Sequence, residues 1–457
     1  MTDESARQSV LFPDLCDKPV LATFDEPHSS SDGGALLLKV IDRRLGLTAA
    51  MAASVTDPRD PAKVRHSVHD LMAQRIYAIA CGYPDANDAD ALADDPVQKL
   101  LLDRDPIGGG RLASQPTLSR FENRAAPRWL YRLGEALATT VLMHHQRRLR
   151  GRARRITLDF DVTDDPTHGA QQLTFFNGHY DTWCYLPLLA FVTFDQEPEQ
   201  HLIAALLRPG NAATIDGTIG LLNRLIPWLR EWFPGARIRV RLDGGFASPV
   251  LFDVLEIHRV EYVVAMGENP VLTRLAEPFM ATIRETAVAA HETTKTYGEA
   301  RYRTKRWPHD RRVIIKAEVL CPPGRTARDN PRFVVTNLTQ TPPWIYEQVY
   351  CARGEIENRI KEALDLRIDR TSCTRFWANH LRVLLTVAAY VLLQELRRRA
   401  VRTGYDRAQV TTLRDRFLKL GARLVVSARR VVVHLPLSCP SAHTWRHIAL
   451  ACGASPG

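Results

Sequence analysis

The chain has 457 residues, of which 45% are hydrophobic and 25% are charged, and its formal net charge is +10. This balance is that of an ordinary globular protein, and it excludes a wholly disordered chain and a collagen-like repeat. At roughly 150 residues per domain, the length indicates about two to four domains.

The charge is distributed unevenly along the chain. Residues 1–100 contain 16 acidic and 10 basic side chains, a net charge of −6, so the remainder carries +16. Because a surface that binds nucleic acid needs clustered positive charge, the later part of the chain is the better candidate for contact with a polyanion.

Residues 1–150 are predicted to be mainly helical. An amphipathic pattern predicts one helix over residues 34–55, and further helices are predicted over 66–81 and 129–150. The third helix ends in the basic run RRLRGRARR, residues 147–155, which is either a solvated helix end or a contact with DNA phosphates.

A strand pattern begins at residue 156. The segment ITLDFDVT alternates apolar and polar residues, which places Asp159 and Asp161 on one face. The next two segments, residues 183–194 and 201–208, are predicted to be strands. A helix over 214–233, a strand over 238–242, a helix over 248–258 and a strand over 260–266 are predicted to follow. An antiparallel three-strand meander followed by α/β units predicts an α/β fold with a mixed sheet flanked by helices.

Residues 295–339 are predicted to be β structure, and the part up to residue 332 contains 11 basic and 4 acidic side chains. Its aromatic residues, among them Trp307, offer stacking surfaces for nucleic-acid bases or form a small core of their own. Helices are predicted from 346 to the mid-360s and over 376–401 and 406–420, followed by a hairpin over 423–435 and a loose tail over 440–457. The apolar run 383–393 is too short to span a bilayer and predicts a buried helix.

The cysteines and the first residues argue against a disulfide framework, a zinc site and a secreted protein. Eight cysteines lie far apart, with no CxxC pair, so neither a disulfide framework nor a zinc site is predicted. The first ten residues, MTDESARQSV, lack the basic and apolar regions of a signal peptide, so we expect a cytoplasmic protein.

Three acidic residues are candidates for metal-dependent chemistry. Asp161 lies on the first strand, Asp243 directly follows a short strand, and Glu357 lies within a helix. Carboxylate oxygens suit Mg²⁺, and two such ions can activate a water or a 3′-hydroxyl for phosphoryl transfer. Each acid also has an ordinary interpretation: Asp243 as a turn former, and Glu357 as an exposed acid paired with Arg353 or Lys361 at four-residue spacing.

Several long phrases resemble the DDE transposases of bacterial insertion sequences, in the family designated "thirteen-eighty". The matching segments include LDFDVTDDPTHGAQQLTFFNGHYDTWCYLPL, RVRLDGGF, IYEQVYCARGEIENRIKE, RTSCTRFWANHLRVLLTVAAYVLLQ and QPTLSRFEN, which together extend over most of the chain. The resemblance implies an RNase H-like mixed sheet flanked by helices, with a β-rich insertion and a mainly helical N-terminal domain.

We accordingly expect five regions. Residues 1–150 form a helical N-terminal region for end recognition or dimerisation, and residues 151–280 the first part of the RNase H-like core. Residues 281–344 form a β-rich basic insertion. Residues 345–402 form the second part of the core, with the catalytic glutamate helix, and residues 403–457 a C-terminal helix and hairpin.

The resemblance also implies the site. Asp161, Asp243 and Glu357 would be the catalytic residues and would hold two Mg²⁺ ions, for which Mn²⁺ could substitute. Asp161 fits the D-x-T pattern of the family, with Asp159 as the alternative two residues earlier. Glu355 competes for the third position, but only Glu357 keeps the family's spacing to the preceding tyrosine and arginine.

The related group carries a Y-x2-R-x3-E-x6-K signature on the helix with the third acid. Tyr350, Arg353 and Glu357 match it, whereas Leu364 occupies the lysine position and Lys361 is the nearest substitute. Tyr350, Arg353 and Lys361 are therefore expected to contact DNA phosphates. The insertion adds the expected DNA contacts Arg306, Arg311, Arg312 and Trp307, with Trp344 as a second candidate aromatic and core packing as the alternative role for each tryptophan.

The expected activity is cleavage at transposon ends followed by attack of the freed 3′-hydroxyl on target DNA. The expected partners are the terminal inverted repeats and target DNA, bound by a homodimer, with no membrane and no organic cofactor. Two alternatives remain: an RNase H-fold nuclease or resolvase without strand transfer, and an inactive, DNA-binding transposase relic.

Overall fold

The computed structural model describes residues 9–456; residues 1–8, which hold most of the segment examined for a signal peptide, lie outside the described residues. The N-terminal region is helical, as predicted, but residues 34–55 form two helices, not one. α1 (Leu36–Leu45) and α2 (Leu47–Ala53) are separated by Gly46, whose φ of 69° is left-handed and ends the first helix.

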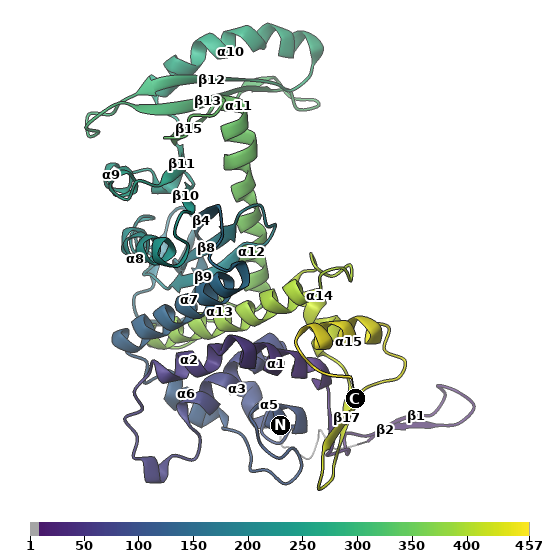
Figure 1. Cartoon of the computed structure of the whole chain (residues 1–457). Helices are drawn as coiled ribbons and strands as arrows, with labels where there is room; N and C mark the ends of the chain where they lie inside the picture. The colour runs from purple at the N-terminus through teal and green to yellow at the C-terminus, as the bar shows by residue number, and fades with distance from the viewer. Residues whose placement is uncertain (1–8, 457) are drawn as a thin grey trace.

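The remaining helices of this region lie below the sheet in Figure 1. They are α3 (Val68–Ala80), α4 (Ala89–Leu92), α5 (Pro96–Leu101), α6 (Gln115–Glu122) and α7 (Pro127–Leu149).

The central sheet has the strand order β12-β13-β15-β11-β10-β4-β8-β9. Its core half consists of β4 (Arg155–Val162), β8 (Leu188–Phe194), β9 (His201–Leu206), β10 (Arg237–Leu242) and β11 (Glu261–Met266). β4, β8 and β9 pair antiparallel, whereas β10 pairs parallel with both β4 and β11. With α8 (Thr218–Trp232) and α9 (Pro249–Ile257) as the connecting helices, this arrangement is the expected RNase H-like core.

The insertion continues the same sheet. β12 (Thr294–Tyr302), β13 (Arg311–Leu320) and β15 (Arg332–Thr336) pair antiparallel, and β15 pairs antiparallel with β11; the short β14 (Arg328–Asp329) pairs with β13. α10 (Pro270–Ala290), to which the sequence analysis assigned no element, covers β12 and β13 (Figure 1). The boundary expected at residue 280 falls inside this helix.

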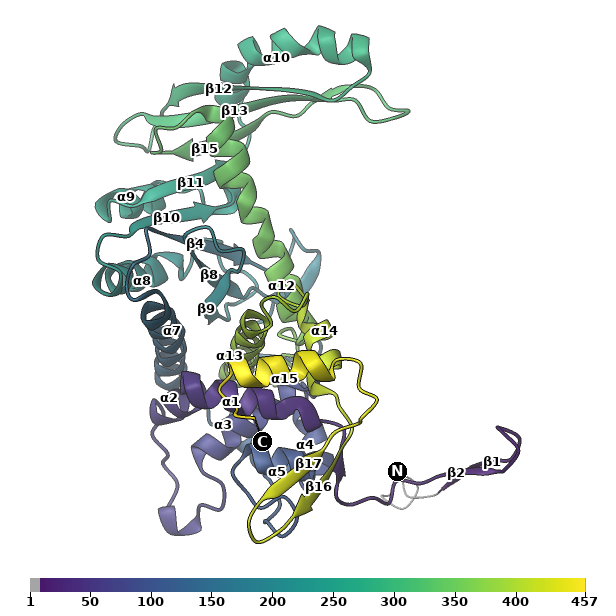
Figure 2. The same ribbon diagram turned by 45° about the vertical axis from the view of Figure 1, so that its right-hand side comes forward.

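A helical rod joins the insertion to the core. It begins with α11 (Pro342–Trp344), continues through a π-helical segment (Ile345–Tyr350) and a 3-10 turn (Cys351–Gly354), and ends in α12 (Glu355–Asp365). Figure 2 shows this rod descending from the insertion, along the sheet, to α13.

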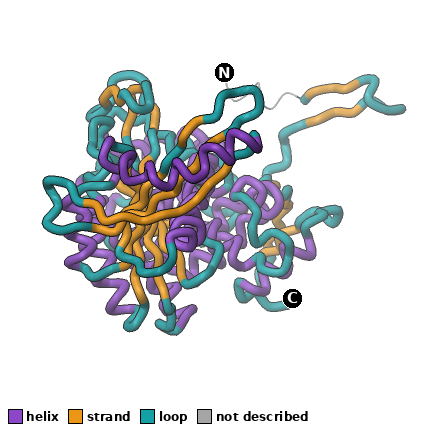
Figure 3. Tube along the Cα trace, turned by 90° about the horizontal axis from the view of Figure 1, so that it is seen from above, coloured by secondary structure: helices purple, strands orange, loops and turns teal. Residues whose placement is uncertain are grey.

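α13 (Phe376–Arg399) is the central core helix. By length and composition it could cross a membrane, but 89% of its most apolar window is buried inside the protein, as the sequence predicts for residues 383–393. Figure 3, seen from above, shows the strands gathered together with helices around them.

The C-terminal residues are not a loose tail. α14 (Val410–Leu413), a π-helical turn (Arg414–Leu418) and the hairpin β16 (Ala422–Val426) and β17 (Val431–His434) are followed by α15 (Ala442–Ala451). Ile448 is fully buried, so α15 packs against the core. β16 also pairs with β3 (Ser29–Ser30), which brings the two ends of the chain together.

Two small sheets complete the fold. β5 (Asp165–Pro166), β6 (Phe175–Asn177) and β7 (Thr182–Tyr185) follow β4, and β1 (Val10–Phe12) pairs with β2 (Val20–Ala22) in a hairpin that extends away from the body (Figures 1 and 3).

Candidate active site

Two of the three predicted acids come from neighbouring strands. Asp161 lies near the end of β4, and Asp243 directly follows β10. Because β4 and β10 are parallel neighbours, their carboxyl ends meet at one edge of the sheet. The Asp243 carboxylate also accepts a 2.9 Å hydrogen bond from the backbone N–H of Gly245, which orients it at the start of the following turn.

The guanidinium of Arg353 lies between the two aspartates. Its Nη2 is 3.0 Å from Asp161 Oδ1 and 3.4 Å from Asp243 Oδ2, and it donates a hydrogen bond to the carbonyl of Phe160. Arg353 is only 8% exposed, and its Nε has no hydrogen-bond partner. The single positive charge of Arg353 is thus shared between the carboxylates of Asp161 and Asp243, and all three groups are partly shielded from solvent.

Burial raises the pKa of Asp161 to about 6. The charge of Arg353 opposes this effect, and the neighbouring Asp243 carboxylate adds to it. At Asp161 the effect of burial on the pKa thus outweighs the opposing effect of the Arg353 charge, so the carboxylate is only partly neutralised by its positive neighbour. Oxygen donors in such surroundings are suited to a hard divalent cation.

Asp159, the alternative to Asp161, has a different environment. It is fully buried, and Arg241 donates two hydrogen bonds of 2.7 Å to its two oxygens, while Gln200 donates a third. Arg241 also donates to the carbonyl of Val349 in the helical rod. All of these contacts are internal, so Asp159 and Arg241 fix β4, β10 and the rod to one another. The geometry favours Asp161 as the residue open to chemistry.

Glu357 is not brought into contact with the aspartates. It is exposed on α12, one turn beyond Arg353, and the structure gives it no ion pair with Arg353 or Lys361. Among residues 9–456, no three His, Cys, Asp or Glu side chains lie close enough together to hold a metal ion. The structure thus unites Asp161 and Asp243 around Arg353 and leaves Glu357 on the adjoining helix.

Other predicted DNA contacts on the rod are accessible to different degrees. Lys361 is exposed on α12, and Trp344 is 36% exposed. Tyr350 is half-buried, its ring centroid lies 5.4 Å from that of Tyr346, and burial raises its pKa.

In the insertion, the structure buries two of the residues predicted to contact DNA, Trp307 and Arg311, and for Trp307 this is the core packing given as its alternative role. Trp307 is 4% exposed and packs edge-on against Phe252, with the Arg311 guanidinium 4.8 Å above its ring. Arg311 is buried and forms an ion pair with Glu256 of α9 at 2.7 Å. Both residues belong to the core.

Arg312 is likewise engaged within the protein. It forms an ion pair with Glu299 and donates a hydrogen bond to the carbonyl of Leu338, so it is not free to contact DNA. Of the arginines predicted in the insertion, Arg306 is the one that is exposed and has no acidic partner among the described residues.

The structural role of Arg241 was not predicted from the sequence. The signal is present in RIRVRL, where Arg239 and Arg241 alternate with apolar residues and share a face of β10. Each forms an ion pair with an acid on an adjacent strand, Glu261 for Arg239 and Asp159 for Arg241.

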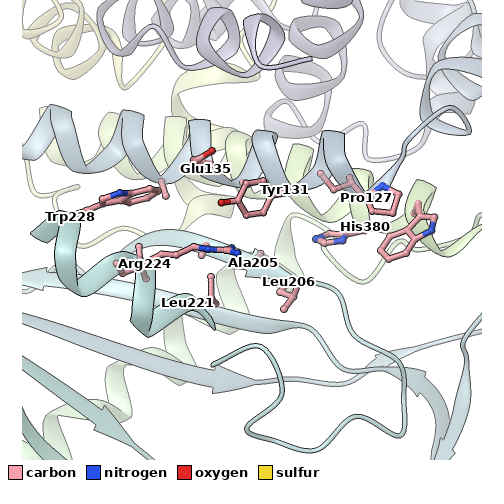
Figure 4. Close-up of a pocket in the computed structure, with 15 residues that line it drawn as sticks. Pro127, Tyr131, Glu135, Ala205, Leu206, Leu221, Arg224, Trp228 and His380 are labelled. Atoms are coloured by element: carbon pink, nitrogen blue, oxygen red, sulfur yellow. The ribbon is translucent and has the colours of Figure 1, made fainter. Parts of the chain in front are cut away.

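An apolar cavity of about 210 Å³ lies elsewhere, between α7, β9, α8 and α13 (Figure 4). At this cavity, Arg224 stacks on the ring of Tyr131 at 4.4 Å, and the buried His380 contributes to the wall. None of the three predicted acids lines it, so the cavity is not part of the candidate active site.

Comparison with known proteins defines the class to which this fold and site belong. Residues 12–452 match the family model described as transposase DDE domain group 1. Since this match extends over nearly the whole chain, the protein belongs to that family of DDE transposases.

Comparison with curated proteins gives no match. Among solved structures, the chain is similar to piggyBac transposase in a cryo-electron microscopy structure of its synaptic complex with hairpin DNA. The two chains are 10% identical, the TM-score is 0.40, and the alignment covers 98% of this chain and 89% of that chain.

Proposed function

We propose that this transposase cleaves DNA at transposon ends in a Mg²⁺-dependent reaction and transfers the freed 3′-hydroxyl to target DNA. The observation that carries the proposal is the meeting of Asp161 and Asp243 at one edge of an RNase H-like sheet, around the arginine of a Y-x2-R-x3-E sequence. Strand ends of such sheets are where catalytic groups commonly project.

In the proposed site, Asp161, Asp243 and Glu357 would hold two Mg²⁺ ions, or Mn²⁺ in their place. Such ions supply activation of the attacking hydroxyl and stabilisation of the leaving oxygen in an in-line phosphoryl displacement. The two aspartates fit this role because they offer partly desolvated oxygen donors that share a single cationic partner.

The chain's own residues position the DNA. Arg353 can pass from the carboxylates to a phosphate, for which its planar guanidinium offers paired donors. Lys361 and Arg306 are exposed and free to bind phosphates, and Tyr350 lies beside Arg353 in the chain. The proposed partners are terminal inverted repeats and target DNA, bound by a homodimer in the bacterial cytoplasm.

The test is a comparison of Asp243→Asn with Glu355→Gln, a matched loss of one charge on the exposed face of α12. We expect Asp243→Asn to lower cleavage of a labelled transposon-end duplex by about 10³-fold or more, because it removes a metal-binding oxygen. Glu355→Gln should cleave like the unmodified chain. Undiminished cleavage or in-cell transposition by Asp243→Asn would show the proposed mechanism to be wrong.

A joining assay separates transposition from simple hydrolysis. A pre-cleaved end with a free 3′-hydroxyl is incubated with supercoiled target DNA and Mg²⁺, and joined products are resolved by electrophoresis. Strand transfer gives target circles linked to the labelled end. Ends that are cut but never joined would instead indicate a nuclease or resolvase.

A further inference from the structure

The N-terminal hairpin is an apolar surface that no other described element covers. Six large apolar side chains in and beside it are between 44% and 85% exposed, namely Val10, Leu11, Phe12, Leu15, Leu21 and Phe24. None of them belongs to a described core cluster, and β1 and β2 pair only with each other. Because an isolated two-stranded hairpin is at best marginally stable in water, this one needs a partner surface.

The charge of the hairpin indicates what kind of partner. Residues 9–26, which we call the arm, contain four acidic side chains and one lysine, a net charge of −3. All five charged residues are exposed, and none forms an ion pair with another residue of the segment 9–456, namely Asp14, Asp17, Lys18, Asp25 and Glu26. An acidic arm is repelled by DNA and attracted by a basic protein surface.

The β16–β17 hairpin has the complementary properties. Residues 421–435 contain three arginines and no acidic residue, a net charge of +3. Val425, Val426 and Val431 are 37–43% exposed on it. In the three-stranded sheet β17-β16-β3, β17 is an edge strand, so its outer backbone groups are free to pair with another strand.

We propose that the arm docks on the β16–β17 hairpin of a second copy of this chain. The exposed valines and the apolar face of the arm would cover each other, and the three arginines would meet the acids of the arm. Figures 1 and 2 show the arm leaving the body beside this hairpin but pointing away from it, which is the geometry of an arm available for exchange. Two reciprocal contacts would give a closed, twofold-symmetric dimer.

The docking contact rests on the homodimer of the proposed function but not on its catalytic part, and its test uses neither DNA nor metal, so docking and catalysis can fail separately. The first measurement is self-association of the full chain by sedimentation velocity. Asp14→Lys/Asp17→Lys reverses the sign of the net charge of the arm, and Arg429→Glu/Arg430→Glu reverses that of the β16–β17 hairpin. Each variant alone should self-associate at least about tenfold more weakly, because like charges then face each other.

An equimolar mixture of the two variants should restore association, since each arm then meets a hairpin of opposite charge. A mixture that associates no better than either variant alone would overturn the proposal, as would a wild-type chain that stays monomeric throughout the concentration range. Leu21→Glu should also weaken association, whereas Val288→Glu, of similar exposure (53% against 58%) on α10, should not.

Cross-linking identifies the copy that is contacted. A photoreactive maleimide on the exposed Cys16 of the arm is activated in a mixture of ¹⁴N- and ¹⁵N-labelled chains. Mixed-isotope peptides that join the arm to residues 421–437 support docking on a second copy. Cross-links confined to one isotope would mean that the arm folds back on its own chain, and would overturn the proposal.

Discussion

Arg353 occupies the place between Asp161 and Asp243 that a divalent cation would need. It supplies positive charge to both carboxylates, and it therefore competes with a metal ion for them. We predict that Arg353→Ala binds Mn²⁺ about tenfold more tightly in the absence of DNA, while cleavage of a transposon end falls because a phosphate contact is lost. Titration calorimetry of the full chain measures the first effect.

The matched control for this prediction is Arg367→Ala, which removes an exposed arginine just beyond α12. It should leave both Mn²⁺ affinity and cleavage unchanged. Weaker Mn²⁺ binding by Arg353→Ala would show that the arginine helps to organise the site and does not compete for it.

Asp165 is a second buried carboxyl, four residues beyond Asp161. It is 1% exposed, and burial raises its pKa to about 8, although the hydroxyl of Thr371 donates to it. Since the folded-state pKa lies above the unfolded value, the protonated form stabilises the fold. This stabilisation is complete below about pH 4 and is lost as the pH rises through 8.

We therefore predict that Asp165→Asn removes part of the fall in stability with pH. Between pH 5 and pH 9, the unmodified chain should lose of order 3 kcal/mol more unfolding free energy than the variant, seen as a steeper decline in the thermal midpoint. Glu355→Gln serves as the exposed control and should follow the unmodified chain. Parallel declines for all three proteins would refute the assignment.

At the scale of elements, α15 is a helix in a segment that the sequence predicts to be a loose tail. Ile448 of this helix is fully buried, whereas Leu450, two residues later, is 39% exposed. We predict that Ile448→Ala lowers the free energy of unfolding by about 2–4 kcal/mol, because it leaves a cavity, and that Leu450→Ala changes it by less than about 1 kcal/mol. The urea midpoint of each variant measures the difference.

Local patterns predicted the elements whose periodicity is strong and failed where it is interrupted. The core strands alternate or are continuously apolar, so their order and the mixed sheet could be predicted. α10 contains Pro278, but its buried residues recur at helical spacing (Leu272, Ala276, Met280, Ile283 and Ala287), so its pattern was present in the sequence and was overlooked. α15 is a single ten-residue helix between Gly- and Pro-containing segments, which offers a shorter pattern. The break at Gly46 depends on one backbone conformation, which a continuous amphipathic pattern does not reveal.

The site was predictable to the extent that its residues share a motif. Asp161, Asp243 and Glu357 were identified through resemblance, since each acid alone has an ordinary interpretation. Core packing of Trp307 was one of two roles left open, and the burial of Arg311 could not be predicted, because both depend on Phe252 and Glu256 of α9, about 55 residues earlier in the chain. A basic run in sequence therefore did not mean a basic surface.

At the scale of the whole molecule, buried ion pairs join the regions. Glu122 of α6 is fully buried between Arg75 of α3, at 3.0 Å, and Arg382 of α13, at 2.8 Å. This triad ties the N-terminal helices to the helix beneath the catalytic sheet. Separating the N-terminal helices from α13 would leave a buried charge of this triad unpaired, which is strongly destabilising. The N-terminal region and the core are therefore expected to move as one body when DNA binds.

The net charge of +10 overstates the charge that is available to DNA, because many arginines are engaged in internal ion pairs. Arg306 and Arg312 lie six residues apart in the insertion, but only Arg306 is exposed without an acidic partner, while Arg312 is held by Glu299. A free arginine that neutralises a phosphate releases a counterion, and a paired one does not.

We therefore predict that Arg306→Ala reduces the slope of log K against log salt concentration for a transposon-end duplex by about 0.9, the value for one phosphate contact. Arg312→Ala should leave the slope unchanged. Fluorescence anisotropy between low and moderate salt measures both, and equal slopes for Arg306→Ala and the unmodified chain would place the DNA elsewhere on the protein.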